Sequence, residues 1–124
     1  MSQILVIAAG GALGSLLRFW ASGGVHALAG RGFPYGTLFV NVTGSLLMGF
    51  LYVWLLERTA LAPEWRAFLL VGLLGGFTTF SSFSIETLNL IESGAMVKAG
   101  VNIILSVTVC IGAAWFGVLL GRQL

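Results

Sequence analysis

The chain has 124 residues, of which 58% are hydrophobic and only 8% are charged. This composition excludes a water-soluble domain, because such a domain needs roughly 25% charged residues to cover its surface. Six basic residues, scattered singly, against four glutamates give a net charge of +2, and this pattern indicates no nucleic-acid partner. The sequence predicts an all-α membrane protein with a single domain over 1–124.

Four apolar runs each have the length that a transmembrane helix needs, which is about 20 residues. The predicted helices cover about 3–29, 37–56, 66–90 and 100–120. The first run begins without a basic stretch and is longer than the apolar core of a signal peptide, so we expect a retained helix. Two pairs of glycines four residues apart, Gly10 with Gly14 and Gly72 with Gly76, predict close contacts between helices.

The most unusual stretch is GGFTTFSSFS at 75–84, in the middle of the third apolar run. Its glycines offer flexible backbone and its threonines and serines offer hydroxyl groups, for which a uniform lipid-facing helix has no use. A membrane accepts non-helical backbone only where protein or a water-filled cavity surrounds it. We therefore expect the third helix to break here. A helix that resumes after the threonines places Phe80 and Phe83 on one face, beside a polar path.

Polar residues recur every four positions along the second and fourth predicted helices. These two stripes are Thr37, Asn41 and Ser45, and Asn102, Ser106 and Cys110. Thr37 is also the predicted N-cap of the second helix. An asparagine in hydrocarbon needs a partner, so Asn41 either hydrogen-bonds a neighbouring helix or points its amide N–H groups into an anion pathway.

Two charged residues fall within the apolar runs. Arg18, in the first run, either faces an aqueous vestibule or extends its guanidinium group to the lipid headgroups. Glu86, in the third, follows Ser82 by four residues, and this spacing suits either a structural hydrogen bond or the lining of a polar pore. A single carboxylate is not a catalytic pair.

The link charges give almost no preference for one orientation in the membrane. Arg58, Arg66 and Arg122 fall on one predicted side, and Arg31 and Lys98 fall on the other, with Arg18 nearer to that second side. A protein without charge bias can insert both ways. Because four short helices are too few to enclose a wet pathway, we expect an antiparallel, dual-topology homodimer.

Over essentially its whole length the chain resembles the Fluc family of fluoride channels, also called CrcB. The resemblance rests on GTL at 36–38 with VN at 40–41, on GGFTTFSSFS at 75–84 with Glu86 beyond it, and on LRFW at 17–20. It implies two pores between the subunits of an antiparallel dimer. Fluoride would leave the cell through these pores passively, which protects the cell against fluoride toxicity.

The resemblance also implies the functional residues. The pore would be lined by Phe80, Phe83, Asn41, Ser81, Ser82, Thr37, Glu86, Asn102, Ser106 and Cys110. Arg18 would lie in a vestibule, and the backbone carbonyls of Gly75 and Thr78 would hold a structural sodium ion at the dimer axis. The sequence departs from the family pattern at two positions: Ser82 stands where a threonine is common, and Cys110 stands where a serine is common.

Three other interpretations compete with a channel. A small multidrug-type exporter shares the size and topology but needs a carboxylate in its first helix, and here that helix has none. A membrane scaffold explains the glycine pairs but not the aromatic and hydroxyl faces. An enzyme is disfavoured, because no nucleophile–base set is present. We expect a multi-pass protein of the cell (inner) membrane, in contact with fluoride, lipid and a second copy of itself.

Overall fold

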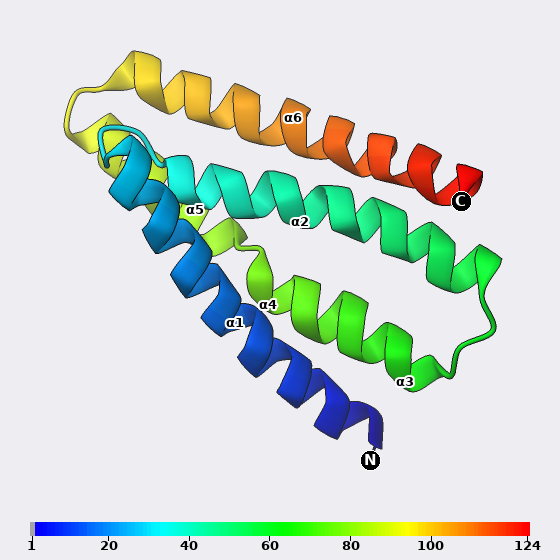
Figure 1. Ribbon diagram of the computed structural model, residues 1–124. Helices are drawn as coiled ribbons and strands as arrows, with labels where there is room; N and C mark the ends of the chain where they lie inside the picture. The colour runs from blue at the N-terminus through cyan, green and yellow to red at the C-terminus, as the bar shows by residue number, and fades with distance from the viewer. Residues whose placement is uncertain (1) are drawn as a thin grey trace.

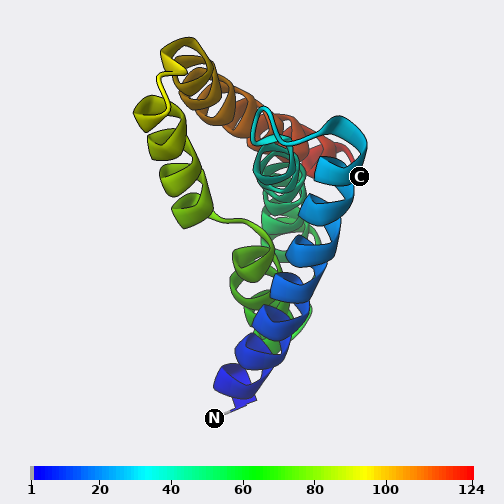
Figure 2. The same ribbon diagram turned by 90° about the vertical axis from the view of Figure 1, so that its left-hand side faces the viewer.

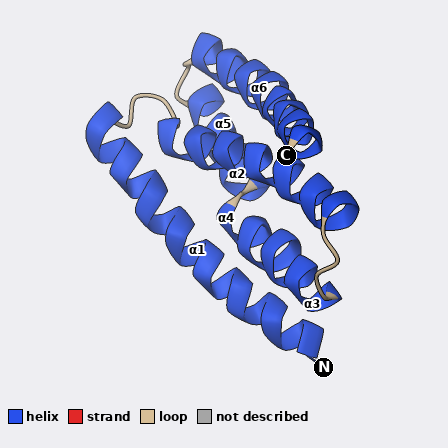
Figure 3. Ribbon diagram, turned by 45° about the vertical axis from the view of Figure 1, so that its right-hand side comes forward, coloured by secondary structure: helices blue, strands red, loops and turns tan. Residues whose placement is uncertain are grey.

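The computed structural model describes residues 2–124, and within this range every regular element is a helix (Figures 1 and 3). Four spans are long and apolar enough to cross a membrane: Ser2–Ala29, Tyr35–Arg58, Pro63–Glu92 and Met96–Gln123. The elements are α1 (Ser2–Ala29), α2 (Tyr35–Val53), η1 (Trp54–Arg58), α3 (Pro63–Arg66), η2 (Ala67–Leu74), α4 (Gly75–Phe77), α5 (Phe80–Glu92) and α6 (Met96–Gln123). The prediction of a four-span helical membrane protein is confirmed.

The spans extend up to four residues beyond the predicted bounds, and the predicted N-cap was wrong. The second span begins at Tyr35 after Pro34, with no side-chain cap, and Thr37 is buried inside the helix. Proline sets its own φ close to a helical value, here −77°, and the Pro34 carbonyl already accepts the N–H of Leu38. The helix therefore starts two residues before Thr37.

Glycines bring the backbones of α1 and the third span together. A Cβ atom added to Gly10 would lie 2.6 Å from the carbonyl oxygen of Phe68, and one added to Gly76 would lie 2.7 Å from that of Gly11. Gly14 and Gly72 make similar backbone approaches across the same contact. Figure 1 shows α1 running beside η2 and α4 along this line. Both predicted glycine pairs thus pack helices.

A second glycine contact joins α2 to α6, which lie side by side in Figures 1 and 2. A Cβ atom on Gly121 would lie 2.9 Å from the carbonyl oxygen of Phe50, and Gly49 and Gly117 face the opposite backbone in the same way. Outside these contacts the surface is apolar: Leu28 is 92% exposed. Exposed aliphatic and aromatic side chains are what lipid tails solvate, so the outward faces fit a bilayer.

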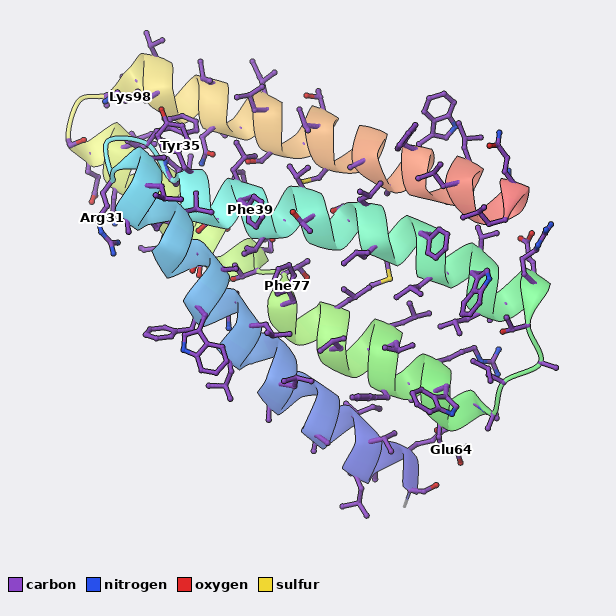
Figure 4. All side chains as sticks on the ribbon, in the orientation of Figure 1. Arg31, Tyr35, Phe39, Glu64, Phe77 and Lys98 are labelled. Carbon is purple, nitrogen blue, oxygen red and sulfur yellow. The ribbon has the colours of Figure 1, made fainter. Side chains whose placement is uncertain are left out.

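The polar ends of the spans separate into two groups. At one end Ser2 Oγ donates to Glu64 Oε2 at 3.1 Å, and Arg58 donates to the Arg122 carbonyl at 3.0 Å. At the other end, Lys98 Nζ donates to the Gly32 carbonyl at 3.1 Å. Figure 4 shows Glu64 at the end of the molecule opposite to Arg31 and Lys98. Both termini and the link between η1 and α3 therefore lie on one side of the molecule. The other two links, 30–34 and 93–95, lie on the opposite side, and we call that side the link side.

Candidate functional site

The third span is interrupted by two residues in extended conformation, Thr78 and Thr79, between α4 and α5. The side-chain amide of Asn41 in α2 is placed against this interruption and pairs with the backbone of Thr79. Asn41 Nδ2 donates to the Thr79 carbonyl at 3.0 Å, and the Thr79 N–H donates to Asn41 Oδ1 at 2.8 Å. The amide thus supplies the donor and the acceptor that one extended residue would otherwise lack. Figure 2 shows the connection that carries α5 away from α4.

Threonine hydroxyls complete the interruption on both sides. Thr78 Oγ1 donates to the Leu74 carbonyl at 2.9 Å, at the end of the preceding helix. Thr79 is the N-cap of α5, because its Oγ1 accepts the N–H of Ser82 at 3.1 Å and lies 3.3 Å from the Ser81 hydroxyl. Local hydroxyls therefore pair some of the backbone polar groups where the chain leaves the helical conformation.

A cavity of about 410 Å³ opens beside the interruption, between α2, α5 and α6. Six residues that the sequence predicted as site residues line it together: Asn41, Thr78, Phe80, Phe83, Ser106 and Cys110. Ser45, the third member of the α2 stripe, is also in its wall. The rings of Phe80 and Phe83 lie 5.4 Å apart at 49°, and Phe80 is 76% exposed. The cavity wall is therefore mostly apolar, with the two aromatic rings on α5 and a few amide, hydroxyl and thiol groups among apolar side chains of α2 and α6.

A chain of buried hydrogen bonds holds the α6 wall against α5. Ser106 donates to Asn102 Oδ1 at 3.3 Å, Asn102 Nδ2 donates to Thr87 Oγ1 at 2.9 Å, and the Thr87 hydroxyl donates to the Phe83 carbonyl at 2.7 Å. Asn102 is only 2% exposed and lies behind the cavity rather than in its wall. The α6 stripe thus fixes the helical turn that carries the Phe83 ring.

Sequence reasoning missed Thr87. The signal was its position four residues after Phe83, because a threonine at this spacing can bond the carbonyl one turn back. Its second partner, Asn102, comes from another span and is not visible in the local pattern.

The remaining predicted residues lie outside this cavity. Arg18 Nε donates to the Gly76 carbonyl at 3.1 Å, so Arg18 lies beside the end of α4. Thr37 is buried in α2, and Ser81 and Ser82 contact the Thr79 cap. Glu86 lines a second cavity, of about 370 Å³, together with residues of the 30–34 link.

No Ser82–Glu86 hydrogen bond forms among the described residues, although the sequence spacing allowed one. Instead, the Oε1 atom of Glu86 is buried and has no hydrogen-bond partner within residues 2–124. A buried polar atom of this kind is costly unless an ion, water or a moving side chain satisfies it.

Comparison with known proteins decides the family. The sequence model described as "CrcB-like protein, Camphor Resistance (CrcB)" matches residues 5–118. The chain belongs to the CrcB family. A Methylococcus capsulatus relative is 55% identical over 98% of this chain, but this chain covers only 54% of that protein, or about half its length. Relatives from Coxiella burnetii (53% identical, 98% of this chain and 99% of theirs) and Geobacter sulfurreducens (48% identical, 100% of both) match throughout. All three carry the name "Fluoride-specific ion channel FluC".

The interruption at Thr78 and Thr79 leaves the carbonyl groups of Gly75 and Thr78 without helical partners. In a continuous helix the Gly75 carbonyl would accept the N–H of Thr79, but that N–H bonds Asn41 instead. The Thr78 carbonyl precedes the extended residue Thr79 and receives no side-chain donor among residues 2–124. Unpaired carbonyl oxygens are suitable ligands for a hard cation, so both residues fit the predicted sodium site.

Proposed function

We propose that this multi-pass membrane protein is a fluoride-selective channel that lets fluoride leave the cell down its electrochemical gradient. The observation that carries the proposal is the cavity in which the Asn41 amide and the Ser106 hydroxyl face the Phe80 and Phe83 rings. Membership of the CrcB family and the name shared by its relatives support the same function. That name denotes a channel rather than an enzyme.

The cavity has the chemistry that a small, strongly hydrated anion requires. Fluoride loses water on entering, and the wall must replace that water with donors. The Asn41 side chain has two N–H groups, of which the Thr79 carbonyl uses one, so the second remains for an anion. Ring edges of Phe80 and Phe83 carry partial positive charge and bind weakly, and weak binding allows the ion to leave again.

We further propose that two copies assemble as an antiparallel, dual-topology homodimer with a pore on each side of the axis. The 76% exposure of Phe80, on a cavity lined by only three elements of one chain, leaves one wall for a partner to supply. The discontinuous third span supports the same arrangement, because a membrane accepts extended backbone only inside protein or beside water. The cell (inner) membrane is the location that matches export from the cytoplasm.

Within this dimer, the carbonyls of Gly75 and Thr78 would hold the structural sodium ion. A bound sodium ion would link the two interrupted helices by accepting lone pairs from these carbonyl oxygens. Exchange of sodium for a larger cation such as N-methylglucamine is expected to lower the thermal midpoint of the purified dimer, because the larger ion cannot enter. An unchanged midpoint would remove the support for this ion.

Fluoride efflux from liposomes containing the purified protein tests the function directly. A fluoride electrode records release after a potassium ionophore is added, and chloride release is followed in parallel. We expect rapid fluoride release that needs the ionophore, without matching chloride release, because a channel moves charge. Release without the ionophore would indicate coupled exchange, and no release from verified dimers would reject the channel.

A further inference from the structure

The second cavity, of about 370 Å³, lies at the link side of the molecule and has no part in the site described above. Its wall combines His26 at the end of α1, Arg31 in the following link, and three polar residues at the end of the third span. These are Glu86 and Asn89 of α5, and Ser93, which directly follows α5. Figure 4 shows Arg31 at this end of the molecule, the end that also carries Lys98.

One face of α5 connects the two cavities. Phe80 and Phe83 line the first cavity, and Glu86, Leu90 and Ser93 line the second. Steps of three or four residues keep side chains on one face of a helix. At 1.5 Å per residue, Glu86 lies about 4.5 Å beyond Phe83 along the axis, and Ser93 lies about 15 Å beyond it. The second cavity therefore begins about one helical turn beyond the Phe83 ring and extends to the residue that follows α5.

The second cavity offers an anion one cation, Arg31, and neutral amide donors, against one carboxylate, Glu86. The Arg31 guanidinium carries five N–H donors. The Asn89 amide adds neutral N–H donors, whereas the Ser93 hydroxyl already donates to the Leu90 carbonyl at 3.0 Å. Lys98 lies outside this wall, and its Nζ donates to the Gly32 carbonyl at 3.1 Å. His26 Nδ1 lies 3.3 Å from the Gly30 carbonyl oxygen. Because a carbonyl oxygen only accepts, Nδ1 is the donor in this contact.

We infer that this cavity is an anion-binding station in series with the pore, with Arg31 as its main ligand for fluoride. The inference rests on the proposed function and extends it to this chain's own link residues. Arg31 concentrates the anion at the entrance to the α5 face. Glu86 lines the same cavity, and no donor among residues 2–124 bonds its buried Oε1 atom. Its carboxylate repels an anion beside Arg31, which keeps that anion from being held too tightly to move on.

The test compares three substitutions at equal protein load. Arg31→Gln removes the charge from the station, Arg31→Lys retains it, and Arg58→Gln removes one charge at the opposite end as a matched control. Arg58 is exposed and contacts the Arg122 carbonyl, far from both cavities. The initial rate of fluoride efflux is measured over a range of internal fluoride concentrations.

We expect Arg31→Gln to raise the half-saturating fluoride concentration about threefold or more, with a maximal rate within about twofold of wild type. Arg31→Lys and Arg58→Gln should stay close to wild type. Equal shifts of the half-saturating concentration in Arg31→Gln and Arg58→Gln would show that the effect comes from general surface charge. No shift in Arg31→Gln would contradict the anion-binding station.

A measurement without transport separates this inference from the proposed function. The thermal midpoint of the purified protein is compared in sodium fluoride and in sodium chloride at one sodium concentration. We expect fluoride to raise the midpoint of wild type and of Arg58→Gln, and to raise it less in Arg31→Gln. If fluoride stabilises wild type but wild type shows no efflux, the proposed channel function is contradicted and the anion-binding station is supported. If wild type conducts fluoride and Arg31→Gln behaves as wild type in both assays, only the anion-binding station is contradicted.

Discussion

At the scale of single residues, Asn41 connects the fold to the proposed pathway. The sequence left two roles open for it, a hydrogen bond to another helix or a place on an anion path. The structure shows the first role, a paired contact with both backbone groups of Thr79. It also places the same side chain in the wall of the cavity. One amide can do both, since it has two N–H groups and a carbonyl oxygen with two lone pairs.

Asn41→Asp separates these roles. An aspartate keeps the acceptor for the Thr79 N–H but loses the donor to the Thr79 carbonyl, and it sets a negative charge in the cavity. We expect fluoride efflux to fall at least about tenfold, because one like charge in a narrow path repels the anion. The lost hydrogen bond should cost about 1–3 kcal/mol of stability. Efflux and the thermal midpoint are measured on one preparation, and undiminished efflux from a folded dimer would contradict a place for Asn41 in the pore.

Residue types were predictable from the sequence, but their partners were not. Periodicity alone singled out Asn102 and Ser106, because polar residues four apart in an apolar run form a stripe. Thr87, which links Asn102 to the Phe83 backbone, lies on another span, and only the packing of α5 on α6 brings the two together. The Glu86 carboxylate failed to bond Ser82 for a similar reason. Glu86 lines the second cavity together with residues of the 30–34 link, which the spacing within one helix does not reveal.

At the scale of elements, the glycine pairs decide how closely the spans approach. Gly10, Gly14, Gly72 and Gly76 were predicted as a contact surface, since a residue without a side chain lets backbones meet. The structure confirms the contact between α1 and the third span. The wide π-helical turns of η1 and η2 were not predictable, because η2 is as apolar as an ordinary membrane-spanning α-helix and η1 is only five residues long. A π-helix is rare and has no strong composition signal.

Gly14→Ala tests this contact, with Gly23→Ala as its control in the same helix. A Cβ atom at Gly14 would lie 3.0 Å from the backbone nitrogen of Phe77, whereas nothing lies within 4 Å at Gly23. We expect Gly14→Ala to cost about 1–3 kcal/mol through overpacking, seen as a lower thermal midpoint. Gly23→Ala should raise the midpoint slightly, since alanine has the better helix propensity by about 1 kcal/mol. A rise in both variants would show that α1 does not depend on close backbone contact.

At the scale of the whole molecule, the structure removes Arg18 from the tally of link charges. Arg18 is hydrogen-bonded beside the end of α4, eleven residues before the end of α1, which is about 16 Å along the helix. It therefore does not belong to the link-side charges. The tally becomes Arg58, Arg66 and Arg122 against Arg31 and Lys98, or three against two. The difference of a single charge gives little orientation preference, which is the condition for insertion in both directions.

Added lysines should break this balance and thereby test the antiparallel dimer. Ala60→Lys with Gln123→Lys adds charge on the side of the termini, and Glu92→Lys with Met96→Lys adds charge on the link side. All four positions are exposed. Each double variant alone is expected to insert in one orientation and to lose most of its fluoride efflux, because it has no inverted partner. Co-expression of the two should restore efflux, since each supplies the orientation that the other lacks. Full efflux from either variant alone would mean that subunits of one orientation suffice, and the pore would then have to be built from parallel chains.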